Sequence, residues 1–328
     1  MFSNSVASVK GLFLAGIGSL IAMSHSAYAA DDFPSQPVRI ISCCAGTVDG
    51  LARILGEHMA QATGQPFIVE TKPGAAGMIA ASYVMKEKPD GYTILFGTGQ
   101  QGANEFLYAQ VPYNYRTDFA PITGIVRNAT GVFVNAASPY FTLADLVADA
   151  KANPGKLTSG WGSTTSRIGS ELFKQLTGVD ILTVGYKSNP QVNIDLIGGR
   201  VTMTIGDIAT NMPHVPTGKL RALAVTTPVR LEQAPDVPTM EEAGIQGYNN
   251  FGSWIASWAP ANTPKARIDK LNSLLGNALK SEKAREYFKT TGMIAFHTTP
   301  EELDAFQVSE HDRWGEIIVA AGIDKEVK

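Results

Sequence analysis

Three short stretches rich in Gly, Ser and Thr are the parts of this sequence whose residues could do chemistry. They are residues 42–50 (SCCAGTVDG), 97–104 (GTGQQGAN) and 159–167 (SGWGSTTSR). The first two follow apolar runs typical of strands, and the third begins within a short strand expected at residues 157–160. At the start of a helix, such a turn leaves backbone N–H groups aimed outward, where the helix dipole favours an anion. Hydroxyl groups add further donors, and these belong to Thr47, Ser163, Thr164, Thr165 and Ser166. Two such turns facing each other predict a site that grips one carboxylate from both sides.

The alternative is that polar residues in these turns only cap their own helices. Asp49, Ser163 and Thr165 all have side chains of the types that cap helix N-termini. For Asp49 we favour the cap, because an acid beside a bound anion would repel it. Three such turns in one chain favour a ligand site over three unrelated caps.

Catalytic signatures are absent from the sequence. It contains no G-x-S-x-G elbow, H-E-x-x-H motif, G-x-x-x-x-G-K-S/T loop, C-x-x-C pair or kinase motif set. The only two cysteines, Cys43 and Cys44, are adjacent, and no His lies near them in the sequence. We interpret them as two small, partly buried thiols, with a vicinal disulfide as the alternative. We therefore expect a protein that is not an enzyme and that has no catalytic residue, no cofactor and no metal.

The N-terminus has the composition of a secretory signal. Lys10 precedes an apolar stretch at residues 11–23, and residues 27–29 (AYA) supply an Ala-x-Ala ending. We predict a signal peptide at residues 1–29 that is cleaved after Ala29, which exports the protein. A membrane anchor is the alternative, but the apolar stretch is short for a bilayer span and has no stop-transfer flank.

Composition and charge narrow the choice of partners. The 328-residue chain is 44% apolar and 17% charged, as globular proteins are, and its length favours two domains. It has 27 basic and 30 acidic residues, and removal of the signal peptide takes one Lys and no acid. A mildly acidic chain without a Lys/Arg cluster is a poor binder of nucleic acid or of anionic membranes.

Strand-like and helix-like patterns alternate along the chain, and the strands and helices that they predict must position the three turns. In the first part, strands are expected at residues 38–41, 67–70 and 92–96, with helices at 51–63 and 77–86. Later elements are expected at residues 131–135, 143–151, 157–160, 166–176, 181–184, 192–197, 201–205, 220–225, 253–259, 267–281, 283–290 and 300–321. The β-α-β order is typical of parallel strands covered by helices.

The strands expected at residues 131–135 and 253–259 bracket the middle block. If the C-terminal helices pack on the first block, the chain crosses between two lobes at both strands. We predict one lobe from residues 30–132 plus 259–328, a second from 133–253, and the second hinge crossing at 254–258. The predicted fold is α/β and two-lobed, each lobe a mostly parallel sheet flanked by helices, with the ligand cleft at the hinge.

Seven short stretches of the mature chain match one known family, in order. They are residues 33–41 (FPSQPVRII), 88–95 (KPDGYTIL), 118–122 (DFAPI), 152–157 (ANPGKL), 218–225 (GKLRALAV), 235–239 (PDVPT) and 259–265 (APANTPK). Through them the chain resembles the Bug family, the periplasmic substrate-binding proteins of tripartite tricarboxylate transporters. The resemblance implies a type II periplasmic binding fold without catalysis, and a ligand carboxylate held by main-chain amides, hydroxyls and water at the first and third turns. It also implies delivery of the ligand to membrane permease subunits.

The first turn departs from the family pattern. Many members carry P-F-x-x-G-G-x-x-D there, whereas this chain keeps Gly46 and Asp49 and has Cys or Ser in place of Phe. The resemblance transfers ligand contacts to Gly46, Thr47 and Val48. The candidate stretch extends to Cys44 and Ala45.

The third turn departs more strongly. Trp161 and Gly162 stand where the family has small residues and an Asn, and Arg167 stands where a His is common. Trp161 could stack on a planar ligand, which favours an aromatic dicarboxylate such as terephthalate; its alternative role is packing at the lobe interface. Arg167 could pair with a carboxylate or remain a solvated charge. Asp207, after a later strand, could accept a hydrogen bond from ligand or water, or cap the next helix.

These observations predict an exported solute-binding protein that closes on a small carboxylate and delivers it to a tripartite tricarboxylate-type permease, acting as a monomer. The candidate ligand-binding residues are Cys44, Ala45, Gly46, Thr47, Val48, Thr98, Gln100, Trp161, Gly162, Ser163, Thr164, Thr165, Ser166, Arg167 and Asp207. An alternative is a module that presents the same ligand to a membrane sensor kinase. A more distant alternative is a secreted α/β hydrolase.

Overall fold

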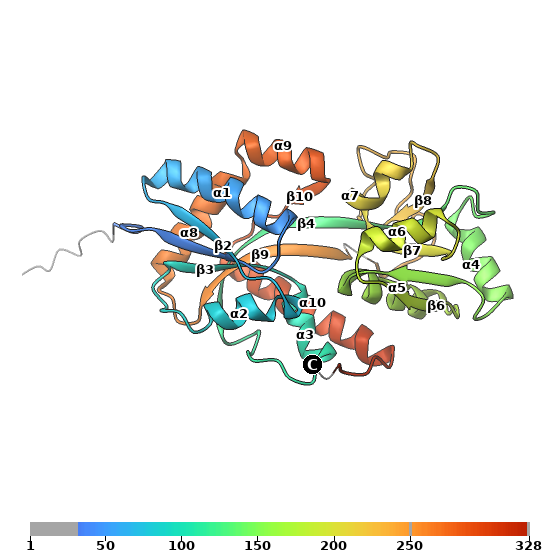
Figure 1. Ribbon diagram of the computed structural model, residues 1–328, viewed down its shortest axis with the longest axis horizontal. Coiled ribbons are helices and arrows are strands. Elements are labelled where there is room, and N and C mark those ends of the chain that lie inside the picture. Colours follow the sequence, from blue (N-terminus) through green and yellow to red (C-terminus); the bar gives the residue numbers. More distant parts are fainter. Residues whose placement is uncertain (1–31, 249–250, 327–328) are drawn as a thin grey trace, which may run out of the picture. The chain divides into compact units, whose positions relative to one another are not determined.

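The computed structural model describes residues 32–248 and 251–326, and one large sheet organises them (Figure 1). The sheet has ten strands in the order β2-β1-β3-β9-β4-β7-β5-β6, with β8 and β10 also paired to β4. The predicted signal peptide at residues 1–29 and its cleavage after Ala29 lie outside the described residues. Within the described part, no helix is long and apolar enough to cross a membrane.

The first strands of the sheet run parallel, as the sequence predicts. They are β1 (Val38–Ser42), β2 (Phe67–Thr71) and β3 (Thr93–Thr98), with β1 between the other two. Between them lie α1 (Thr47–Thr63), the short helix η1 (Ala75–Gly77) and α2 (Met78–Val84). The buried side chains of α1 recur every three or four residues, so the helix presents one apolar face to the sheet.

A single long strand, β4 (Phe119–Asn135), takes part in two sets of pairings. From Phe119 to Ala129 it runs antiparallel to β9 (Gly252–Pro260), and around residue 127 it also pairs with β10 (Met293–Ala295). From Thr130 onward it pairs with β7 (Met203–Asp207) and β8 (Leu220–Val225). The strand therefore changes all of its partners between Ala129 and Thr130.

The middle block repeats the parallel arrangement. Strands β5 (Thr158–Trp161), β6 (Leu182–Gly185) and β7 are mutually parallel, with β5 in the centre. The helices around them are α4 (Leu143–Ala152), α5 (Thr164–Thr177), α6 (Asn189–Ile197), α7 (Ile208–Asn211) and η2 (Met212–His214). The carboxyl ends of parallel strands meet at one edge of a sheet, which brings the turns after β5 and β7 near each other.

Helices close the chain. They are α8 (Lys265–Leu279), α9 (Glu282–Thr291) and α10 (Pro300–Ala320). Helix α10 starts with a capping box between Thr299 and Glu302 and packs against β4, α5 and α3 (Gln100–Leu107). Helices α8 and α9 pack against α1 of the first block, whereas α10 contacts elements of both blocks.

The predicted α/β fold is confirmed, with some elements longer than expected. Helix α1 begins at Thr47 rather than at residue 51, β4 begins at Phe119 rather than at residue 131, and α3 and β10 are additional. The four strands β4, β8, β9 and β10 make antiparallel pairings within the otherwise parallel sheet. The division into lobes at residues 30–132 plus 259–328, 133–253 and 254–258 stays a prediction.

Candidate functional site

The first turn connects β1 to α1 and leaves the start of that helix uncapped. Gly46 is the N-cap residue, with φ of +81° and no side-chain capping bond. The first helical amide to find an acceptor is that of Gly50, which donates to the Gly46 carbonyl at 2.8 Å. No acceptor in the described chain receives the amides of Thr47, Val48 or Asp49. This helix start therefore has the donors that an anion needs.

The interpretation of Asp49 as a helix cap is wrong. Asp49 lies inside the first turn of α1, where its carboxylate accepts hydrogen bonds from Arg53 at 2.8 Å and from the Thr71 hydroxyl. The Arg53 guanidinium holds the pKa of this carboxyl below its usual value. The negative charge is thus directed to its own partners and away from the three amides.

Two cysteines precede this helix start. Cys43 is buried, Cys44 is half-buried, and their Sγ atoms lie 2.7 Å apart as free thiols. The hydrogen bond between the two sulfurs raises the pKa of Cys43 and lowers that of Cys44, although burial acts against the lowering at Cys44. The amide of Thr98, from the second turn, lies beside the Cys43 sulfur and acts against the rise at Cys43.

The second turn connects β3 to α3 and reaches the third. The Gln100 side-chain amide donates a hydrogen bond of 2.7 Å to the hydroxyl of Thr164. Gly99, between Thr98 and Gln100, lies so close to the Trp254 ring that a Cβ atom would stand 2.4 Å from it. The Cys43 amide also donates to the Phe96 carbonyl of β3 at 3.0 Å. These bonds connect all three turns.

The third turn is a capping box at the start of α5. The hydroxyl of Ser163 accepts from the Ser166 amide at 3.2 Å, and the hydroxyl of Ser166 accepts from the amides of Ser163 and Gly162 at 3.0 and 3.2 Å. The capping alternative is therefore confirmed for Ser163 and not for Thr165. Within the described residues, the amides of Thr164 and Thr165 have no acceptor. This helix therefore presents two unpaired donors at its start, where α1 presents three.

The side chains of Trp161 and Arg167 contact each other. The guanidinium carbon of Arg167 lies 4.9 Å from the centroid of the Trp161 ring, and its Nη1 lies 3.7 Å from a carboxylate oxygen of Glu326. A Cβ atom on Gly185, in the neighbouring strand, would stand 2.7 Å from the same ring. Trp161 thus contacts Arg167 and strand β6, and Arg167 already has an acidic neighbour.

Asp207 ends β7 and belongs to a polar chain that begins at Ser166. The Asn189 side chain donates to the Asp207 carboxylate at 3.1 Å and accepts from the Ser166 hydroxyl at 3.5 Å. Burial raises the pKa of Asp207 to about 6, and the hydrogen bond from Asn189 acts in the opposite direction. The Asp207 side chain makes no capping bond to α7. Sequence reasoning missed Asn189 because the helix was expected to start at residue 192.

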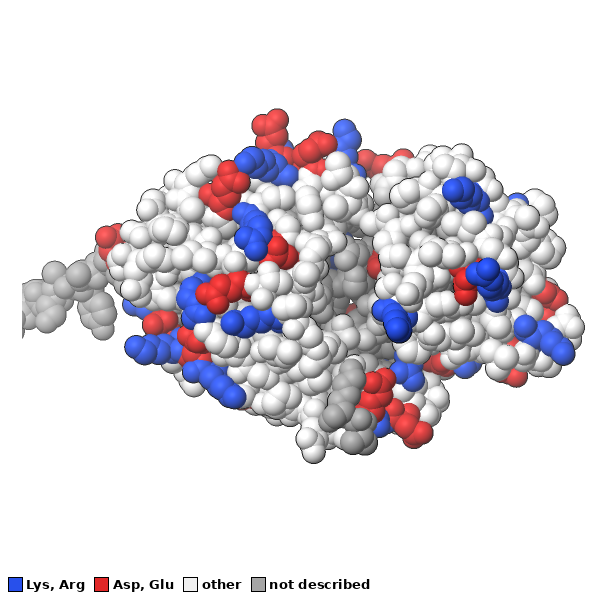
Figure 2. Space-filling model, in the orientation of Figure 1, with Lys and Arg blue, Asp and Glu red and all other residues white. Residues whose placement is uncertain are grey.

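The surroundings of the site carry mixed charge. Figure 2 shows acidic and basic side chains interspersed over the displayed face, without a broad patch of one sign. Among the described residues, no cluster of three or more His, Cys, Asp or Glu side chains could hold a metal ion. The unpaired donors of the two helix starts are therefore the feature that suits a small anion.

Similar proteins share both the sequence and the fold. A sequence model of the "Tripartite tricarboxylate transporter family receptor" matches residues 51–323. Protein BugT of Bordetella pertussis is 30% identical over 322 residues, which are 96% of each chain. The solved structure of Rpa4515 from R. palustris with adipate is 33% identical, with a TM-score of 0.76 over 90% of this chain and all of that one. MatC from Rhodopseudomonas palustris with bound malate is 26% identical, with a TM-score of 0.72 over 87% of this chain and all of that one.

Proposed function

This chain belongs to the tripartite tricarboxylate transporter receptor family, the Bug proteins, and we propose that it captures a small dicarboxylate between the starts of α1 and α5 and delivers it to a membrane permease. Members of this family are periplasmic substrate-binding proteins and not enzymes. The proposal concerns the ligand, its contacts and the partner.

One observation carries the proposal: two helix N-termini with unpaired amides belong to one connected set of turns. At α1 these are the amides of Thr47 and Val48, and at α5 those of Thr164 and Thr165. A carboxylate is the ligand group that accepts several N–H bonds and gains from a helix dipole. A dicarboxylate offers one such group to each helix. The adipate and malate of the two solved relatives are both dicarboxylates.

The length and shape of the ligand form the finer part of the proposal. Trp161 supports an aromatic dicarboxylate such as terephthalate, because its half-buried ring belongs to the third turn. Arg167 lies over that ring, so a planar ligand would have to stack on the opposite face or displace the guanidinium. The adipate of the 33% identical relative supports a flexible chain instead. Titration calorimetry with adipate, malate and terephthalate on residues 30–328 separates these ligands.

Proline substitutions test the amides directly. Thr47 and Thr164 are the first residues of their helices, where Pro is tolerated and removes only an N–H that the helix does not use. We expect Thr47→Pro and Thr164→Pro each to weaken adipate binding by about tenfold or more, since charge-assisted hydrogen bonds contribute about 1.5–3 kcal/mol.

Matched variants keep the amide and remove the hydroxyl. Thr47→Ala and Thr164→Val should retain adipate binding better than their proline counterparts, and thermal unfolding should show all four folded. Adipate binding of wild-type strength in both proline variants would overturn the proposed contacts.

Delivery to a permease is tested in cells. A strain that lacks this protein should lose uptake of the bound dicarboxylate and regain it with the wild-type gene. Normal uptake combined with loss of a transcriptional response to the ligand would favour presentation to a sensor kinase instead.

A further inference from the structure

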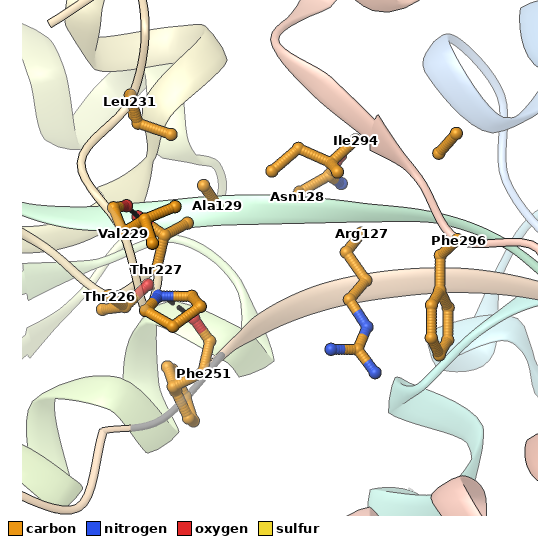
Figure 3. Close-up of a pocket in the computed structure, with 12 residues that line it drawn as sticks. Arg127, Asn128, Ala129, Thr226, Thr227, Val229, Leu231, Phe251, Ile294 and Phe296 are labelled. Carbon is orange, nitrogen blue, oxygen red and sulfur yellow. Dashed lines mark hydrogen bonds between the residues drawn. The ribbon is translucent and has the colours of Figure 1, made fainter.

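We propose a second ligand site, for a small carboxylate with one charged group and an apolar body, in a cavity beside β4. The cavity has a volume of about 310 Å³ and is shown in Figure 3. None of its lining residues belongs to the three turns of the dicarboxylate site. Its described walls come from four places in the fold: residues 127–129 of β4, residues 226–229 and 231 after β8, Phe251 just before β9, and residues 294–296 at β10.

Among the described residues that line this cavity, Arg127 is the only charged one. Its guanidinium carbon lies 3.8 Å from the centroid of the Phe296 ring and 4.4 Å from that of Phe306. In Figure 3 the side chain extends from β4 toward the space between Phe251 and Phe296. The aromatic rings hold the cation in place without supplying an acceptor.

The donors of Arg127 lack acceptors within the described chain. Its Nε is buried without a hydrogen-bond partner, and its guanidinium makes no ion pair there. Glu310, the acid whose charge acts on it, pairs with Arg313 at 3.5 Å. Arg127 is half-buried, and leaving its buried Nε without an acceptor is costly; burial accordingly lowers the pKa of Arg127. A carboxylate from outside the chain would supply two acceptors in the geometry that Arg prefers.

The other residues that line the cavity favour a ligand with an apolar body. Leu231, Phe251 and Phe296 form the walls, and two further lining residues, Val229 and Ile294, are 70% and 46% exposed. Large apolar side chains exposed around one cavity mark a binding surface. A volume of about 310 Å³ is at the lower end for small-molecule pockets. A second carboxylate would have no cation to meet, so this site should reject the dicarboxylates proposed for the first site.

Octanoate is the probe, tested by calorimetry on residues 30–328 with saturating adipate present. We expect wild-type protein to bind octanoate and not 1-octanol, which has the same chain without the charge. Arg127→Met keeps the aliphatic stem against the rings and should weaken octanoate binding at least tenfold, while adipate binding stays unchanged. Arg127→Lys should bind octanoate with intermediate affinity, because it keeps the charge and loses the paired donors.

Two substitutions at exposed Val residues test the site without relying on the folding of the Arg127 variants. Val229→Asp places a negative charge at the cavity and should weaken octanoate binding at least tenfold. Val319→Asp is the matched control, since Val319 is 72% exposed on α10 and does not line the cavity. Failure of wild-type protein to bind octanoate would overturn the proposal, as would equal octanoate binding by the two Asp variants. Displacement of octanoate by adipate, or its loss in Thr47→Pro, would place octanoate in the first site and also overturn it.

Discussion

The side-chain amide of Gln100 donates a hydrogen bond of 2.7 Å to the hydroxyl of Thr164. The two residues are the first residues of α3 and α5, 64 positions apart in the chain. The bond joins the turn after β3 to the turn after β5, which otherwise belong to separate groups of parallel strands. It also fixes the position of Thr164, whose amide is one of the unpaired donors of the site.

Removal of this bond should weaken ligand binding. We expect Gln100→Ala to reduce adipate affinity by about three- to tenfold, because a hydrogen bond contributes about 0.5–1.5 kcal/mol and this one orients a helix start. Calorimetry is the measurement, and Gln61→Ala, at an exposed position of α1, is the control. Tighter binding by Gln100→Ala would mean that Gln100 competes with the ligand for Thr164.

The capping box at Ser163 should have two measurable effects. Ser163→Ala should lower the free energy of unfolding by about 1 kcal/mol in urea titrations, as expected for loss of an N-cap. Thr142→Ala removes the corresponding box of α4 and should cost about the same. Only Ser163→Ala should also weaken adipate binding, because it loosens the helix start that carries the amides of Thr164 and Thr165. Equal adipate affinity in both variants would leave Ser163 a purely structural residue.

Asp207 should make stability depend on pH. Its pKa in the folded protein, about 6, lies above the ordinary value of 3.8, so the folded state binds this proton more tightly than the unfolded state does. The resulting stabilisation is complete below about pH 4 and is lost as pH rises through 6. Relative to Asp207→Asn, the wild type should therefore lose about 1–2 kcal/mol between pH 4 and 7, allowing for partial solvent screening. Urea unfolding of both proteins across this range tests it, and a constant difference would contradict it.

The adjacent cysteines should react at different rates. Cys44 is half-buried with a lowered pKa, whereas Cys43 is 1% exposed with a raised pKa. In native protein at neutral pH, iodoacetamide should modify Cys44 first, since the thiolate is the reactive form. Peptide mapping by mass spectrometry gives the order, and denatured protein, in which both sites are accessible, is the control. In Cys43→Ala, Cys44 should react more slowly because its thiolate loses the neighbouring hydrogen-bond donor; faster reaction would argue against that role of Cys43.

Strong periodicity made most elements predictable. Strands β1, β2 and β8 and helices α4, α9 and α10 follow their apolar patterns to within a residue or two. The start of α1 was missed because its first turn is short of large apolar residues. Helix α3 was missed because Gly, Asn and Gln, which rarely signal a buried face, fill its buried side. Pro121 and several polar residues likewise hid the first half of β4.

The site was predictable in its turns and less so in its bonds. The Gly, Ser and Thr pattern located the starts of α1 and α5 with their unpaired amides, because helix geometry determines which amides lack an intrahelical acceptor. The Gln100–Thr164 and Asn189–Asp207 bonds depend on how distant elements pack, which no local pattern encodes. Arg127 did have a local signal: it is the one charged residue in the sequence from Phe119 to Asn135 that forms β4. A charged side chain inside a largely apolar strand requires a group that neutralises its charge.

Because β4 contributes side chains to two hydrophobic clusters, it affects how the protein unfolds. Its side chains alternate between two hydrophobic clusters: Val132 and Val134 belong to the larger, and Ala129 and Phe133 to the smaller. If either cluster lost its packing, one face of β4 would be exposed while the other cluster still packed against the opposite face. Unfolding of one cluster should therefore destabilise the other. Thermal unfolding of the described chain should then occur in one cooperative transition. The segments that pair with β4 on both sides of Ala129 are thus expected to unfold at the same temperature.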